Sequence, residues 1–202
     1  MTPDEFRTLR PAVYHLTYPV NRAGIEAAGL RPAAELVAAS SLPAREQMRL
    51  LTRPRPTERT LTLFDGHTAR LRDNRALSWA RLQPLVEGIA PGAFLRLLNS
   101  HVFLWPTRER VDTLVRARVY RNLTQLLITI PTASLSDDTL TRLHASRINS
   151  GATRGNARRS RATYVPLRDA TTRQIERAAE YAVRGYIPAD ELRAATYKEV
   201  RA

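Results

Sequence analysis

The hydrophobic residues of this chain fall into short runs that are interrupted by proline, glycine and polar residues. Residues 125–130 form a continuous leucine, isoleucine and threonine run, which predicts a strand that ends at Pro131. Similar runs predict strands at residues 13–17, 101–105 and 162–167. Because such runs alternate with stretches of helical spacing, the pattern predicts an α+β fold.

Apolar residues at helical spacing predict helices between these strands. The clearest follows Thr107, a capping residue, and carries Val111, Leu114, Val115 and Val119 on one face. An Asp65-Gly66 pair predicts a β-hairpin over residues 60–72. Further helices are expected in two pieces within residues 31–52, at residues 77–89 and 92–98, and from Ser136 onward.

A helix with both ends marked should follow the first strand. Asn21 is a favourable N-cap, and Val20 before it is placed to pack on Ile25. Gly29 suits the left-handed position after a helix, from which Leu30 can fold back onto Ile25. These twenty residues therefore predict a strand, a tight turn, a short helix and a glycine stop.

The chain is strongly basic, with a formal charge of +13 over 202 residues, and Lys198 is the one lysine among 32 basic residues. A GC-rich genome would favour arginine by itself, but the physical consequence is the same, because a positive field attracts phosphates and polyanions. Cysteine is absent, no apolar run could span a membrane, and the acidic N-terminus does not look like a secretory signal. We expect a cytoplasmic protein without a membrane partner and one domain over residues 1–202.

The segment Tyr14-His15-Leu16-Thr17, followed by Asn21 and a helix that ends in Gly29-Leu30, resembles the first motif of ADP-ribosyltransferases. The resemblance is closest to bacterial DarT-like DNA ADP-ribosyltransferases and related uncharacterised families. It implies a split, mixed or antiparallel sheet with short helices around it. It also implies that His15, Thr17 and Asn21 contact NAD, with the His15 ring on the adenosine ribose. The alternative is a core histidine satisfied by the backbone.

A second segment, Phe103-Leu104-Trp105-Pro106, resembles the aromatic strand of the same family. Phe103 and Trp105 point to one face of a strand, and either ring could stack on the nicotinamide. Two ordinary core aromatics are the alternative interpretation.

A third segment, Ala178-Ala179-Glu180-Tyr181-Ala182, resembles the final motif of the family, which makes Glu180 the catalytic glutamate. Ala178 stands where the family usually has glutamine, and the local spacing suits a helix. On the resemblance we predict a strand over residues 176–183, with Glu176 as the second candidate. A carboxylate there would stabilise the positive charge that develops on the ribose and accept a proton from the acceptor.

Arginine is the residue expected on the pyrophosphate of NAD. The DNA-targeting relatives use one from the middle of the chain, where Arg70, Arg72 and Arg75 are candidates. We select Arg72 as the second catalytic residue.

Residues 149–161 form a polar, basic stretch where the related enzymes place their substrate-recognition loop. A nucleic-acid acceptor is expected to contact this basic loop, unless it is simply a solvated segment. The candidate contacts are Asn149 (with Asn156 as its alternative), Arg154, Arg158, Arg159 and Arg161.

The sequence thus predicts an ADP-ribosyltransferase-like α+β domain that uses NAD as substrate and modifies a nucleobase, with single-stranded DNA as the expected partner. Two alternatives stay open: an RNA 2′-phosphotransferase-like enzyme on the same fold, and a non-catalytic nucleic-acid-binding module. Since the relatives are toxins, the resemblance also implies an antitoxin partner. The four histidines lack metal-like spacing, so no metal site is expected.

Overall fold

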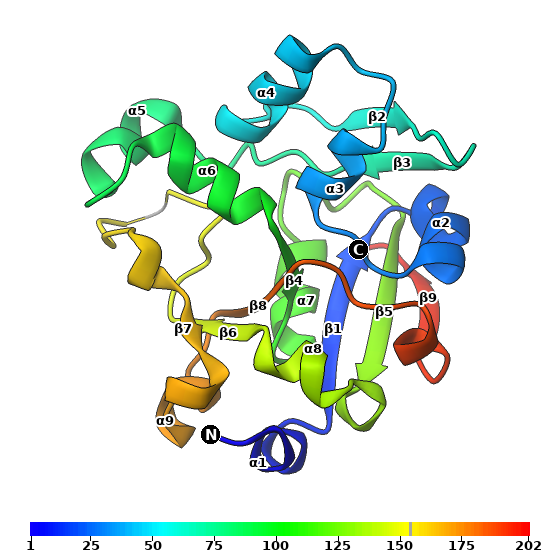
Figure 1. Ribbon diagram of the computed structural model, residues 1–202, viewed down its shortest axis with the longest axis vertical. Helices are drawn as coiled ribbons and strands as arrows, with labels where there is room; N and C mark the ends of the chain where they lie inside the picture. The colour runs from blue at the N-terminus through cyan, green and yellow to red at the C-terminus, as the bar shows by residue number, and fades with distance from the viewer. Residues whose placement is uncertain (154) are drawn as a thin grey trace.

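A computed structural model describes residues 1–153 and 155–202, and it shows short helices around antiparallel sheets (Figure 1). The α+β prediction is confirmed. One sheet has the order β1-β5-β9, in which the buried strand β5 (Gln125–Pro131) lies between β1 (Ala12–Thr17) and β9 (Thr196–Val200). In its register His15 pairs with Ile128.

A second sheet has the order β4-β8-β6-β7. Strand β8 (Glu180–Arg184) lies between β4 (His101–Leu104) and β6 (Leu143–Ser146), and β7 (Val165–Pro166) pairs with the far side of β6. The two sheets meet where Tyr14 and Trp105 exchange backbone hydrogen bonds of 3.1 and 2.7 Å. This bridge holds β1 beside β4.

A β-hairpin forms the upper part of the view in Figure 1, made of β2 (Arg59–Thr62) and β3 (Thr68–Leu71). Its inward residues Leu61 and Leu71 pack with Val37 in a small cluster of their own. The main core joins both sheets through residues such as Ile128 and Leu104. The hairpin and the two sheets are therefore stabilised by separate apolar clusters.

The helices are short and lie around the sheets (Figure 1). They are α1 (Pro3–Leu9), α2 (Arg22–Ala28), α3 (Ala33–Ala38), α4 (Ala44–Thr52), α5 (Trp79–Leu82), α6 (Pro91–Asn99), α7 (Arg108–Val115), α8 (Asp137–Thr141) and α9 (Thr172–Glu176). Within the described part of the chain, none is long and apolar enough to cross a membrane.

Several predicted elements are confirmed, namely the strands at 13–17, 101–104 and 125–130, the 60–72 hairpin, and the helices within 31–52, after Thr107 and after Ser136. The helix after Thr107 ends at Val115, so Val119, which was expected on its apolar face, lies beyond it and is exposed. The helix expected over 77–89 is wrong, because α5 ends at Leu82 and a 3₁₀ turn that contains Pro84 follows. The strand expected over 162–167 shrinks to the two residues of β7, after a 3₁₀ turn at Arg161–Thr163. Strands β6 and β9 were not expected.

The strand predicted over 176–183 is correct from Glu180 and wrong before it. Thr171 and Gln174 form a capping box that starts α9, and this helix continues to Glu176. Strand β8 then pairs with β4 and β6 on both sides. Tertiary pairing therefore overrides the helical spacing of Ala178, Ala179 and Ala182.

The ends of α2 differ from expectation in two details. The Asn21 side chain makes no capping bond, because its amide is bonded to β3 and β1 instead. Gly29 has the expected positive φ of 83°, but the Leu30 N–H donates to Ile187 O at 2.9 Å and not back into the helix as in a Schellman motif. An antiparallel bridge between Leu30 and Ile187 follows.

Candidate functional site

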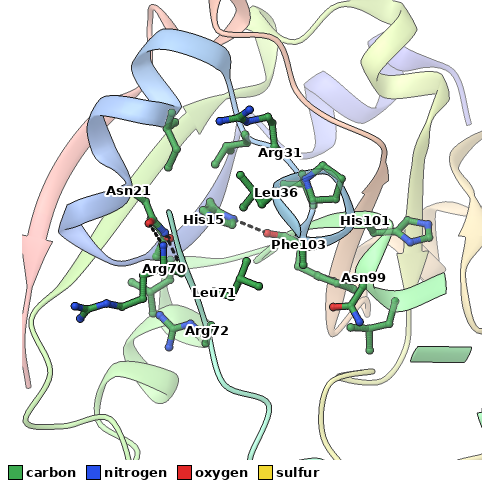
Figure 2. A pocket seen from close by; sticks show the side chains of 18 of the residues that line it. His15, Asn21, Arg31, Leu36, Arg70, Leu71, Arg72, Asn99, His101 and Phe103 are labelled. Atoms are coloured by element: carbon green, nitrogen blue, oxygen red, sulfur yellow. Dashed lines mark hydrogen bonds between the residues drawn. The ribbon is translucent and has the colours of Figure 1, made fainter. Parts of the chain in front are cut away.

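A cavity of about 250 Å³ lies between β1, β3 and β4, under the segment that joins α2 to α3 (Figure 2). All five residues predicted to contact the cofactor line it, together with the predicted Arg72. These residues are His15, Thr17, Asn21, Phe103 and Trp105. Further polar lining comes from Arg31, Arg55, Arg70, Asn99 and His101. The structure thus brings together side chains from distant parts of the sequence.

The His15 ring is held by the neighbouring strand. Its Nδ1 lies 2.8 Å from Phe103 O, the contact drawn as a dashed line in Figure 2. Burial lowers the pKa of His15 to about 4, so the ring is neutral near pH 7. A neutral ring that donates from Nδ1 to a carbonyl has an unprotonated Nε2. His15 is therefore satisfied by the backbone on one side and offers an acceptor on the other.

Asn21 fixes the position of β3 against β1. Its Oδ1 accepts from the Arg70 N–H at 2.6 Å, and its Nδ2 donates to Arg70 O at 3.0 Å and to Thr17 Oγ1 at 2.7 Å (Figure 2). The amide bonds the backbone of Arg70 as a neighbouring strand would. It therefore fixes the position of Arg70 in β3 and of Arg72, which follows this strand. Asn21 is thus a positioning residue at the wall of the cavity.

The Arg72 guanidinium lies among polar and aromatic groups. Its Nη2 donates to Gln125 Oε1 at 2.5 Å, and its carbon lies 5.3 Å from the ring centres of both Tyr18 and Tyr120. Burial lowers the pKa of Arg72. Within residues 1–153 and 155–202, its buried Nη1 has no hydrogen-bond partner.

Arg55 brings a second buried cation to the same cavity. It is 8% exposed, and its Nη1 donates to Asn99 Oδ1 and to Leu50 O, each at 2.9 Å. Burial lowers the pKa of Arg55 to about 10. In the described part of the chain Arg55 forms no ion pair, and neither does Arg72. Buried charges are normally paired, so a cavity lined by two such cations suits an anionic ligand.

Glu180 starts β8 and is 5% exposed, but it does not line this cavity. Its Oε1 accepts from the Ser150 N–H at 3.0 Å and from Ser150 Oγ at 2.5 Å. Burial raises the pKa of Glu180 to about 7, against the lowering effects of Ser150 and of the Arg159 charge. Glu176, the second candidate, is exposed at the end of α9.

The sequence profile of a family described as "Family of unknown function (DUF7002)" matches residues 11–192. The chain belongs to this family. The matched range includes every residue of the cavity and Glu180. No curated protein matches the chain, and no solved structure does.

A second cavity of this DUF7002 chain, of about 460 Å³, adjoins the first, because Trp105 and Leu114 line both. Its other lining includes Arg110, Tyr120, Asn149, Arg159 and Ala179. Ala179 precedes Glu180, and Asn149 precedes the Ser150 that binds it. The sequence neighbours of Glu180 and Ser150 thus line the second cavity.

The basic loop is attached to the segment at residues 76–87. The Thr153 N–H donates to Ala76 O, the Arg159 N–H to Leu85 O, and the Glu87 N–H to Arg159 O. Arg159 is 1% exposed and donates to Ala157 O and Ala152 O, so its side chain holds the loop together. A fully solvated segment does not describe this loop.

The other predicted nucleic-acid contacts are exposed where the structure describes them. Arg158 is exposed and pairs with Glu87 at 3.3 Å, and Arg161 and Asn149 are exposed as well. Arg154 lies outside the described residues. Asn156, the alternative to Asn149, is exposed too, so four exposed polar side chains remain as candidates on the surface.

Sequence reasoning missed Arg55, Ser150 and Tyr164. Arg55 stands between Pro54 and Pro56, which predicts an extended linker and gives no sign of burial. Ser150 lies within the basic loop and bonds a residue thirty positions away. No local sequence pattern indicates the burial of Arg55 or the hydrogen bond from Ser150 to Glu180.

Proposed function

We propose that this DUF7002 chain is an NAD-dependent ADP-ribosyltransferase that modifies a nucleobase, with single-stranded DNA as its acceptor. The observation that carries the proposal is the convergence of six predicted residues on one cavity, since they come from three separate segments, at residues 15–21, 72 and 103–105. Three segments that the resemblance assigns to one ligand thus meet at one cavity.

The cavity has groups that suit each part of a dinucleotide. The buried cations Arg55 and Arg72 can bind the pyrophosphate, since guanidinium groups contact phosphate in pairs of hydrogen bonds. The unprotonated Nε2 of His15 can accept a hydrogen bond from a ribose hydroxyl. The rings of Phe103 and Trp105 line the same wall and can stack on an aromatic base.

Glu180 would supply the carboxylate of the reaction. Breaking the bond between nicotinamide and ribose develops positive charge on the sugar, which a nearby carboxylate stabilises. With a pKa of about 7, Glu180 can also accept a proton from the attacking group near neutral pH. The reacting end of the substrate would have to reach Glu180 from Trp105, where the two cavities adjoin.

The second cavity suits the acceptor. Ala179, the neighbour of Glu180, lines it, and the Trp105 ring there can stack on an unpaired base. Arg110 and the formal charge of +13 favour a phosphate backbone nearby. A single-stranded acceptor avoids the free energy of extruding the base from a duplex.

One observation favours a second candidate, an RNA 2′-phosphotransferase-like activity. Such an enzyme would rely on histidine and arginine and would not need the glutamate. His15, Arg55 and Arg72 line the first cavity, whereas Glu180 does not. The two candidates differ in what they require of Glu180.

The test is label transfer from NAD. The protein is incubated with NAD labelled on the adenylate and, separately, with single-stranded DNA, duplex DNA, RNA, 2′-phosphorylated RNA and a protein lysate. We expect label on single-stranded DNA, its loss in Glu180→Gln, and its retention in the exposed control Glu176→Gln. Removal of the 2′-phosphate by the Glu180→Gln variant would favour the second candidate. An absence of nicotinamide release with every acceptor would refute both.

A further inference from the structure

The Glu180 carboxyl is the end of a chain of hydrogen bonds that starts at a buried tyrosine. Tyr164 Oη donates to Ser150 Oγ at 2.8 Å, and Ser150 Oγ donates to Glu180 Oε1 at 2.5 Å. The Ser150 N–H donates to the same carboxyl oxygen at 3.0 Å. In the described part of the chain, no comparable contact is made to Oε2.

We propose that Ser150 and Tyr164 are positioning residues that orient Glu180 and keep it ionisable, with Oε1 held by the chain of hydrogen bonds and Oε2 left for the substrate. This inference rests on the proposed function for its catalytic meaning. The hydrogen-bond geometry and its effect on Glu180 stand without that function.

The direction of the chain is set by the carboxylate at its end. Ionised Glu180 can only accept, so Ser150 donates to it and accepts from the Tyr164 hydroxyl. Burial and the nearby Glu180 charge raise the pKa of Tyr164, so this hydroxyl stays protonated. Ser150 then has its own proton free for Glu180, and a hydroxyl that accepts one bond donates more strongly in the next. Both donors favour the ionised form of the carboxyl, which burial disfavours.

Rigid surroundings hold each donor in place. Ser150 is fully buried. Three residues later, Thr153 is bonded to Ala76 O and to the Ser78 N–H. The Tyr164 ring stacks on His101, with 4.9 Å between ring centres and an interplanar angle of 22°. His101 lines the first cavity, and burial lowers its pKa to about 4, so the stack is uncharged near pH 7.

The other groups that face Glu180 are few. Arg159, from the end of the loop, lowers the pKa of Glu180 through its charge. Ser146 of β6 pairs with Glu180 in the sheet register, but its hydroxyl is bonded to Ile148. The chain from Tyr164 through Ser150 therefore supplies the hydrogen bonds that oppose desolvation.

The experiment is a carboxyl titration by NMR of the full chain with ¹³C-labelled glutamate. The Glu180 signal is assigned by its loss in Glu180→Gln. Because the loss of a hydrogen bond destabilises the charged form, Ser150→Ala should raise the pKa of Glu180 by about one unit or more. Tyr164→Phe should raise it by a smaller amount, because the serine donor remains.

Tyr181→Phe is the matched control. It removes another buried tyrosine hydroxyl, bonded to Ile175 O, from the residue next to Glu180. We expect an unchanged pKa of Glu180 in this variant. If Ser150→Ala fails to fold, Tyr164→Phe decides alone. An unchanged Glu180 pKa in the folded variants, whatever happens to their melting temperatures, would overturn the proposal.

The NMR titration does not need NAD. A negative result in it can therefore be distinguished from a negative result in the NAD transfer assay. A shifted pKa without any nicotinamide release would leave the hydrogen-bond chain in place and refute the transferase. If transfer occurs, the acidic limb of the kcat profile should move upward in pH by the amount that NMR records.

Discussion

Replacing Glu180 with glutamine should remove a specific dependence of stability on pH. Burial raises the pKa of Glu180 from 4.5 to about 7 in the folded protein. Between these values the folded state keeps a proton that the unfolded chain releases, so the free energy of unfolding falls as pH rises. This contribution is complete below about pH 4.5 and is lost as pH rises through about 7. At about 1.36 kcal/mol per pKa unit, the loss is about 3 kcal/mol.

Urea unfolding of the wild type and of Glu180→Gln, from about pH 5 to about pH 8, measures this contribution. The stability of the variant relative to the wild type should rise by about 2.5 kcal/mol over that range, because glutamine has no proton to lose. Glu176→Gln, at the exposed end of α9, reports the effect of removing one acidic charge from the surface. A difference between Glu180→Gln and wild type that does not change with pH would refute the argument from burial.

Three further predictions concern the walls of the cavity. Asn21→Ala should lower the free energy of unfolding by roughly 1–3 kcal/mol, because the Arg70 N–H and C=O lose their partner; denaturant unfolding would contradict this if it showed no loss. Gly29→Ala should lower it by roughly 2–4 kcal/mol, since a Cβ there would lie 2.1 Å from Ile187 O at a φ of +83°; a melting temperature equal to that of the wild type would be incompatible with this geometry. Inorganic pyrophosphate should raise the melting temperature of the wild type, and it should do so much less in Arg55→Met, because the buried cation is gone. An equal rise in both proteins would show that pyrophosphate binds elsewhere.

Local signals in the sequence predicted the elements that depend on local chemistry. The strand before Asn21 and the positive φ of Gly29 follow from short-range preferences, and both occur in the structure. The hairpin at Asp65-Gly66 is another case, with Gly66 at a φ of 82°. These positions need no knowledge of the rest of the chain.

Other features depend on partners far away in the sequence. The start of β8 at Glu180 is set by pairing with β4 and β6, which no window around residue 180 contains. Asn21 bonds Arg70, a residue 49 positions away, so its side chain leaves the helix end that local preference assigns to it. The burial of Arg55 arises in the same way, from the contact with Asn99.

The candidate site shows the same division. The sequence identified His15 and Trp105 through short motifs and offered Arg72 as one of three arginines in an interval, and all three residues line one cavity. It could not show that Ser150 covers Glu180, because that contact joins a loop to a strand through tertiary packing. Only the folded structure shows that Glu180 lies outside the cavity.

The most direct test of the account is calorimetric titration of the Glu180→Gln protein with NAD, in which turnover is suppressed and binding remains. We predict saturable binding at one site per chain. Arg72→Gln in the same background should weaken it at least about tenfold, which is about 1.4 kcal/mol. The control Arg161→Gln removes the same charge from an exposed position of the loop and should leave the affinity unchanged. Absence of binding, or equal affinity in the Arg72 and Arg161 variants, would contradict the assignment of the cavity to NAD.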